Sequence, residues 1–202
     1  MMQKLDHRKI LKQLYSASSA KPTIVDVPVL NFLMIDGRGK PDGNGFQQAA
    51  QALFPLAYTL KFKIVRSRLA VDFHVMPMEV RWNVDRQAKS FGWTMMLMQP
   101  DFVSREMFLE AVEMLRGEGQ PPVQLAAVRF ETSTEGLCVQ FMHTGPYPGM
   151  DANLDKMTAF ADANGYAIPE RKVHDIYLND SRKTKPENLR AIMRLPVVDG
   201  RR

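Results

Sequence analysis

One pattern occurs twice in this chain and limits its fold more than any other feature. Residues 137–164 (LCVQFMHTGPYPGMDANLDKMTAFADAN) run from an apolar stretch through a glycine–proline corner into a helical pattern. Residues 30–61 repeat this order, with LNFLMIDGRGKP followed by FQQAAQALFPLAYTLK. Gly37 and Gly145 mark the two corners and lie 108 positions apart. A period this long predicts two half-domains, because solenoid repeats recur every 20–50 residues or so.

The first half is predicted to run strand, helix, strand, strand. A strand over Leu30–Ile35 leads to a helix over Phe46–Lys61, whose apolar residues recur with helical spacing. Pro55 should kink this helix, since proline removes an intrahelical hydrogen bond. The β-prone runs LAVDFHVMPMEVRWNV and SFGWTMMLMQ are separated by the polar DRQAKS, which predicts a hairpin.

The second half is predicted to repeat this order after a linking helix. Ser104 is the expected N-cap of that helix, which covers Arg105–Arg116. A short helix over residues 3–15 is expected before the first half. The elements expected after the linking helix are a short strand, a strand, a helix, a strand, a helical turn and a closing strand, at Ala126–Glu131, Leu137–His143, Ala152–Asn164, Val173–Leu178, Lys185–Leu189 and Ala191–Leu195.

Composition restricts the possible functions. The 202 residues are 45% hydrophobic and 24% charged, as in ordinary soluble globular proteins, and the single cysteine, Cys138, cannot form an internal disulfide. Without an apolar run of about 18 residues or a secretory signal, a cytoplasmic location away from membranes is expected. The net charge of +5 comes from Lys and Arg spread along the chain, so specific nucleic-acid binding is not expected.

Neither a cofactor nor a metal ion is predicted. The glycines at positions 37, 39, 43 and 45 match neither G-x-G-x-x-G nor G-x-x-x-x-G-K-[ST], so they indicate a flexible turn. His74, His143 and His174 lack the close spacing of metal ligands.

Strand alternation sorts residues 173–178 onto two faces. The set that begins with His174 is expected to lie under a helix, which leaves Val173, Asp175 and Tyr177 for the opposite face. An acid beside a phenol on a face without a helix would suit a ligand cleft.

Five phrases of the sequence carry a resemblance to a known family. They are FxxAAxALFPLAYTLKF, PMEVRW, WTMMLMQPDFV, EGLCVQFMHTGPY and VHDIYLNDSRKTKPENLRAIMRLPV, and they extend from about residue 25 to residue 198. Together they resemble the GyrI-like small-molecule-binding proteins. The resemblance implies an α+β fold in which a pseudo-twofold pair of strand-helix-strand-strand units forms a curved antiparallel sheet. Helices would cover one face of this sheet, and an aromatic ligand cleft would lie on the other.

The resemblance also implies a domain organisation and two types of function. An N-terminal helix and loop over residues 1–22 would precede a GyrI-like domain over 23–200, with halves at about 30–100 and 125–198 joined by the helix at 104–117. Similar domains bind effectors in multidrug-responsive transcription activators. Some stand-alone members hydrolyse the reactive cyclopropane of DNA-alkylating natural products, and others only bind. This chain has Asp175 where the family usually has glutamate, and Asn83 where it usually has a second aromatic.

The catalytic candidates are Glu79, Asp175 and Tyr177. Either carboxylate is a candidate general base that orients water, and Tyr177 or Tyr147 is a candidate hydrogen-bond donor to a developing phenolate. Without chemistry, the same groups would bind a flat cation by charge and cation–π contact.

The ligand-binding candidates have aromatic, thioether or imidazole side chains. Alternation leaves open which face of residues 93–98 lines the cleft, and a hydrogen-bonded edge histidine is the alternative for His143. Parity places Glu79 and Trp82 on opposite faces, so a bulge or strand bend near Pro77 is expected to bring them together. The ligand-binding candidates are Trp82, Trp93, Met96, Phe141, His143 and Tyr147.

The leading hypothesis is a stand-alone binding protein for flat aromatic or cationic small molecules that also hydrolyses electrophilic cyclopropanes. The alternative is a non-catalytic module, which either sequesters ligands or inhibits a protein partner such as a topoisomerase. The oligomeric state is left open.

Overall fold

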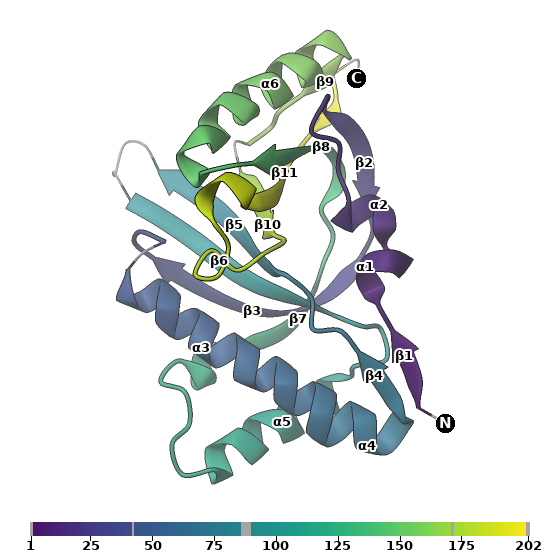
Figure 1. The fold of residues 1–202 in the computed structure, drawn as a ribbon, viewed down its shortest axis with the longest axis vertical. Coiled ribbons are helices and arrows are strands. Elements are labelled where there is room, and N and C mark those ends of the chain that lie inside the picture. The colour runs from purple at the N-terminus through teal and green to yellow at the C-terminus, as the bar shows by residue number, and fades with distance from the viewer. Residues whose placement is uncertain (1, 42, 86–89, 171, 201–202) are drawn as a thin grey trace.

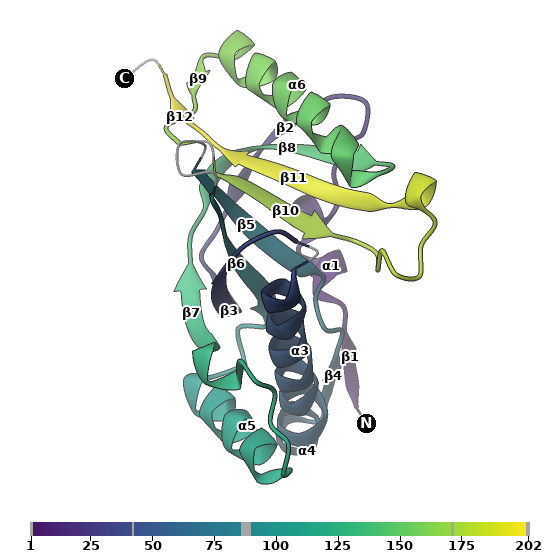
Figure 2. The ribbon, with the colours of Figure 1, turned by 90° about the vertical axis from the view of Figure 1, so that its left-hand side faces the viewer.

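An eight-stranded antiparallel sheet forms the centre of the protein in a computed structural model, which describes residues 2–41, 43–85, 90–170 and 172–200 (Figures 1 and 2). In sheet order the strands are β2 (Thr23–Val27), β8 (Gly136–Thr144), β11 (Arg190–Pro196), β10 (Val173–Tyr177), β5 (Met78–Asp85), β6 (Ser90–Gln99), β3 (Leu30–Arg38) and β7 (Arg129–Ser133). Two short ladders accompany this sheet, β1 (Gln3–Leu5) with β4 (Val71–Phe73) and β9 (Tyr166–Ala167) with β12 (Val198–Asp199). The fold is therefore α+β, as predicted.

The long helices agree with the predictions, and the N-terminal helix does not. Ser104 caps the helix after it as predicted, since its Oγ accepts a hydrogen bond from the Met107 amide. Residues 3–15 contain one short strand and two four-residue helices, because Leu11 leaves the helical conformation between them. The helices are α1 (His7–Ile10), α2 (Lys12–Tyr15), α3 (Asn44–Thr59), α4 (Arg66–Leu69), α5 (Arg105–Gly117) and α6 (Met150–Ala163), with shorter turns η1 (Leu60–Val65), η2 (Leu125–Ala127), η3 (Tyr147–Gly149) and η4 (Pro186–Asn188).

The helix around Pro55 is longer than expected. Pro55 lies inside α3, where the kink stays a prediction, and beyond Thr59 the helix continues through a π-helical turn into α4. This extension buries Leu60, Ile64 and Val65, which explains why the helix continues past the predicted end. The predicted hairpin is present as β5 paired with β6, although residues 86–89 of its turn lie outside the described residues.

The two halves repeat one topology. The first contains the ladder β3-β6-β5 with α3, and the second contains β8-β11-β10 with α6. They meet where β5 pairs with β10, with Val80 opposite Asp175. On the next strand outward, Val80 faces Met95 and Asp175 faces Met193. Asp175 therefore lies at the centre of the sheet, on the seam between the halves.

The corner glycines match differently from the prediction. Equivalent positions of the two halves can be found by counting outward from the seam. Leu33, which faces Leu97, is then equivalent to Val139, which faces Leu195. Six residues beyond Leu33 and Val139, Gly39 and Gly145 have left-handed φ angles of 104° and 110°. Gly39 is thus the counterpart of Gly145, and the match of Gly37 with Gly145 was wrong by two residues.

The outer strands bend the sheet back on itself. Only Pro28 and Val29 separate β2 from β3, yet these strands pair with different halves. Thr23 faces Gln140 before this break and Leu30 faces Ser133 after it, so the ladder resumes in the same register. Pro28 therefore occupies a strand break, the kind of position in which a missing N–H is tolerated.

Different segments cover the two faces of the sheet. Helix α3 packs with α5 over the first half, and α6 packs over the second (Figure 2). The opposite face is covered by the N-terminal segment, whose Leu14 and Tyr15 pack on the sheet. None of the helices within the described ranges is long and apolar enough to cross a lipid bilayer.

Candidate functional site

Asp175 is a buried carboxylate that lies on the seam between the two halves. It exposes 5% of its surface. Trp82 on the neighbouring strand donates a hydrogen bond from Nε1 to Oδ2, at 2.8 Å. Oδ1 is buried and has no hydrogen-bond partner among the described residues. A buried acceptor without a partner is costly, so it marks a position where a ligand can supply the missing donor.

Two groups of contacting aromatic side chains, five rings in all, adjoin this carboxylate through Trp82, Tyr147 and Tyr177, and they are called the aromatic cluster below. Phe46, in the first turn of α3, stacks on Trp82 with ring centroids 5.9 Å apart, and it contacts Trp93 edge to face at 5.1 Å. Tyr147 contacts Tyr177 edge to face at 5.3 Å. Of the candidates, Trp82, Tyr177 and Tyr147 lie beside Asp175, and Trp93 joins them through Phe46, which the sequence did not single out.

The aromatic cluster lies on the face of the sheet that α3 and α6 cover, whereas the ligand cleft was predicted on the opposite face. The alternation along β10 holds, but Tyr177 packs with the core under α3 and Val173 with the core under α6. Ile176 packs on the opposite face, against the core that includes Leu14 and Tyr15. The expectation that His174 and Ile176 lie under a helix of the repeated units was therefore wrong. Alternation separates two sets of residues, but it does not determine which segment covers each set.

Gly37 makes room for one wall of the cluster. It faces Trp93 across the β3–β6 ladder. A Cβ atom at Gly37 would lie 2.1 Å from Cη2 of the indole, so any side chain there would push the ring away. The glycine run noted in the sequence thus includes a packing position for a tryptophan.

Burial controls the electrostatics of the cluster. It raises the pKa of Asp175 to about 7, although His174, Trp82 and Tyr177 each lower it. Burial and the nearby Asp175 also raise the pKa of Tyr177 and of Tyr147 above the usual tyrosine value. Near neutral pH the site therefore holds a carboxyl group that can gain or lose a proton, beside phenols that keep theirs.

Glu79 lies on the other face of the sheet. The β5–β10 ladder is continuous from Met78 to Trp82, so the bulge expected near Pro77 is absent from this pairing. Glu79 is fully buried, and its Oε1 accepts a hydrogen bond of 2.7 Å from the Tyr15 hydroxyl. Because this pairing is uninterrupted, side chains alternate between the two faces, and Glu79 therefore does not share a site with Trp82 and Asp175.

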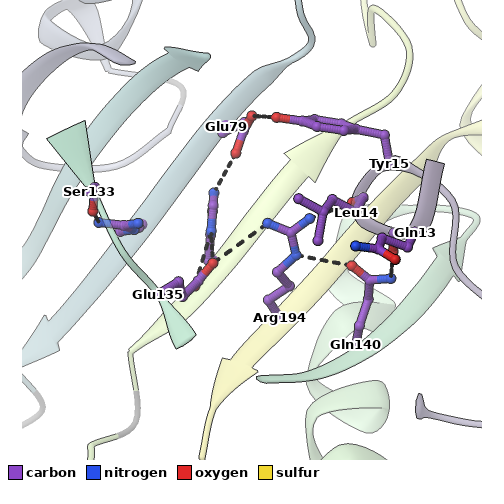
Figure 3. A network of polar contacts seen from close by, with 10 residues as sticks. Gln13, Leu14, Tyr15, Glu79, Ser133, Glu135, Gln140 and Arg194 are labelled. Carbon is purple, nitrogen blue, oxygen red and sulfur yellow. Dashed lines mark hydrogen bonds and ion pairs between the residues drawn. The ribbon is translucent and has the colours of Figure 1, made fainter. Parts of the chain in front are cut away.

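Glu79 belongs to a buried set of charges that we call the ionic network (Figure 3). The Nε2 atom of His174 lies 3.0 Å from Oε2 of Glu79, and its Nδ1 atom lies 3.0 Å from Oε2 of Glu135. Arg194 lies 3.6 Å from Glu135 through Nη1 and donates from Nε to Gln140 at 3.0 Å. The pairing of Glu79 and His174 with Glu135 and Arg194 was not predicted from the sequence, because these residues come from segments far apart in the chain.

The other candidates have structural positions. Met96 is buried in the core on the face of the ionic network, and Phe141 in the core under α6. His143 contacts the carbonyl oxygens of Gly145 and Pro146 through Nε2, at 3.0 and 3.1 Å, and Asn153 through Nδ1, at 2.9 Å. Both ring nitrogens are thus engaged in holding the second corner. Among the described residues, no three His, Cys, Asp or Glu side chains are arranged to hold a metal ion.

Comparison with known proteins agrees with this fold. The family model of the GyrI-like small molecule binding domain matches residues 118–198. A hydrolase from Listeria innocua is 39% identical, with a TM-score of 0.86 over 96% of this chain and 100% of the other. An uncharacterised conserved protein from Listeria innocua is 38% identical, with a TM-score of 0.87 over the same shares. A search of curated proteins gave no match.

A more distant structure shares the fold alone. The C-terminal domain of EcmrR is 12% identical, with a TM-score of 0.53 over 89% of this chain and 98% of that domain. The fold and the family match define a small-molecule-binding domain. The chain belongs to the GyrI-like family, as its five phrases suggested.

Proposed function

We propose that this protein binds flat aromatic or cationic small molecules at the aromatic cluster, and that it hydrolyses electrophilic cyclopropane compounds there. The observation that carries this proposal is the buried Oδ1 atom of Asp175, which has no assigned hydrogen-bond partner among the described residues and lies beside aromatic side chains. A similar protein of known structure, 39% identical, is described as a hydrolase. The proposed binding domain covers residues 23–200, with residues 1–22 as an N-terminal addition.

The proposed reaction uses Asp175 as the base. Water attacks a cyclopropane carbon, the strained carbon–carbon bond breaks, and its electron pair moves through a conjugated dienone to the oxygen. Asp175 accepts the proton of the water at Oδ1, and Tyr147 or Tyr177 donates a proton to the phenolate. A base with a pKa of about 7 is suited to proton transfer at neutral pH.

Ligand entry requires a ring to move, because Asp175 is almost fully covered. Phe46 is the best candidate, since it is only half-buried and lies parallel to Trp82, with 6° between the ring planes. A flat ligand that stacks on Trp82 would take the place of the Phe46 ring. Phe46→Ala should therefore raise the association rate of a planar dye in stopped-flow measurements.

The test of hydrolysis follows the dienone absorbance of a cyclopropane-fused cyclohexadienone. Asp175→Asn keeps the shape of the side chain but removes its basic oxygen, so turnover should fall by about 10² to 10⁴. The control is Asp155→Asn, an exposed carboxylate on α6, which should leave turnover unchanged. Equal turnover in wild type and Asp175→Asn would show that Asp175 is not the base.

A second measurement separates binding from chemistry. A rhodamine-type cation and a neutral planar dye are titrated while tryptophan emission is followed. Asp175→Asn should weaken the cation and leave the neutral dye unchanged, because it removes only the charge. Dye binding without any turnover of the cyclopropane would uphold the binding function and refute the hydrolase.

A further inference from the structure

The ionic network holds a histidine that must be positively charged. Both ring nitrogens of His174 lie 3.0 Å from carboxylate oxygens, one of Glu79 and one of Glu135. An ionised carboxylate can only accept hydrogen bonds, so each nitrogen needs its own proton. Burial lowers the pKa of His174, but Glu135 and Glu79 together raise it above the usual value. Glu135 remains ionised, because His174, Arg194 and Arg81 outweigh its burial and lower its pKa to about 2.

The N-terminal segment closes the network off from water on one side. Tyr15 donates its hydroxyl proton to Glu79, and Arg194 donates from Nη2 to the carbonyl oxygen of Leu14. Gln140 donates to the Gln13 carbonyl at 3.0 Å (Figure 3). A charge enclosed in this way is screened less than a charge at the surface.

The network lies directly behind the aromatic cluster. His174 and Asp175 are consecutive residues of β10, so their side chains point to opposite faces of the same strand. The groups that act on Asp175 from the front are the Trp82 indole N–H and the phenols of Tyr177 and Tyr147. From behind, the charge acting on it is the imidazolium of His174.

We propose that His174 is a positioning residue for the site, which acts through the sheet to favour the ionised form of Asp175 against the effect of burial, while Glu79 and Glu135 hold the two protons of His174. This proposal rests on the proposed role of Asp175 in the function above. The imidazolium favours the carboxylate form of Asp175 by direct charge attraction. Its own two carboxylates compensate the charge of His174 and that of Arg194, and Arg81 adds a positive charge that also acts on Glu135.

The proposal predicts shifts of opposite sign. His174→Gln leaves an excess negative charge behind Asp175, and the midpoint of the Asp175 titration should move to higher pH. Glu79→Gln and Glu135→Gln leave an excess positive charge, and the midpoint should move to lower pH. A unit charge about 10 Å away, at an effective dielectric constant of about 20, corresponds to roughly one pH unit.

A hollow in the surface gives protons access to the network. It has a volume of about 160 Å³ and is lined by Arg81, Thr134, Glu135, Lys172, His174 and Pro196. The titration should therefore come to equilibrium without unfolding of the protein.

The experiment needs no ligand. In a Trp93→Phe background, Trp82 is the single remaining tryptophan, and its indole N–H, which is bonded to Asp175, reports the titration by NMR. The midpoint should lie near pH 7 with the network intact, rise in His174→Gln and fall in Glu79→Gln and Glu135→Gln. Glu131→Gln, an exposed carboxylate on β7, is the control and should leave the midpoint unchanged.

Each outcome decides the proposal. Opposite shifts support it, and unchanged midpoints or shifts of one sign in folded variants refute it, because a purely structural His174 would change stability alone. If His174→Gln fails to fold, the shift in Glu135→Gln decides the proposal: a downward shift supports it and an unchanged midpoint refutes it. This substitution lies at the hollow and leaves the Glu79–His174 pair in place. A failure to bind dye would contradict the proposed function without altering these titrations.

Discussion

Two carboxylates lie on the two faces of one sheet, and they have opposite surroundings. Glu79 accepts a hydrogen bond from Tyr15 and pairs with His174, in a network completed by Glu135 and Arg194. Asp175 has one oxygen bonded to Trp82 and another with no partner among the described residues. A buried charge beside an opposite charge is compatible with a structural role, whereas a buried acceptor without a donor marks a position for a ligand. The sequence marked both as candidates, but only Asp175 has the surroundings of a binding site.

The protein should lose the most stability when a partner is removed from the ionic network. Arg194 is 1% exposed and bonds Gln140, Glu135 and the Leu14 carbonyl. Arg194→Met should destabilise the protein by about 3–5 kcal/mol, because it leaves Glu135 buried without its second cation. Urea denaturation measures this change. Arg182→Met removes an exposed arginine that pairs with Asp180 and should leave the stability nearly unchanged; similar losses in both variants would contradict the contrast.

Removing the charge of Asp175, on the opposite face of the sheet, should make the protein more stable. The folded pKa of Asp175 is raised to about 7, from a reference value of 3.8. Between these values the unfolded chain releases the proton while the folded protein keeps it, so stability falls as pH rises through this window. At pH 8 Asp175→Asn should therefore be more stable than wild type by about 2–4 kcal/mol, and at pH 3 the difference should vanish. Thermal unfolding at both pH values is the measurement, and destabilisation at pH 8 would show that Asp175 is structural.

The link between the N-terminal segment and the network gives a smaller effect. Tyr15→Phe removes one hydrogen bond to the Glu79 carboxylate and should cost about 2 kcal/mol. Tyr58→Phe, at an exposed position on α3, is the matched control and should cost almost nothing. Chemical denaturation of the two variants compares them directly. Equal stabilities would mean that the segment is held by its apolar contacts alone.

The smallest effect is expected for the donor to Asp175. Trp82→Phe keeps an aromatic ring but removes the N–H bonded to Oδ2. Affinity for a planar dye should fall about fivefold, which corresponds to roughly 1 kcal/mol for a reduced stacking surface. Asn83→Ala changes the exposed neighbour and should leave the affinity unchanged. Stronger dye binding by Trp82→Phe would argue that the indole blocks the site.

Much of the fold was predictable because its signals are local. The caps, the helical spacing of α3 and α6, and the alternation along β5 and β10 all depend on residues close together in the chain. Parity alone already separated Glu79 from Trp82, and the structure keeps that separation. The predicted bulge was wrong, because β5 pairs with β10 without interruption from Met78 to Trp82.

The sequence by itself therefore determined the long helices, the main strands of the repeated halves, their order and the two sets of side chains on each of these strands. Only the tertiary structure decided which set meets α3 and α6 and which meets the N-terminal segment, because this choice depends on packing between segments far apart in the chain. The same reason hid the ionic network, whose members come from β5, β10, β11 and the connection before β8. Local patterns specify what a strand presents on each side, and long-range contacts determine what it faces.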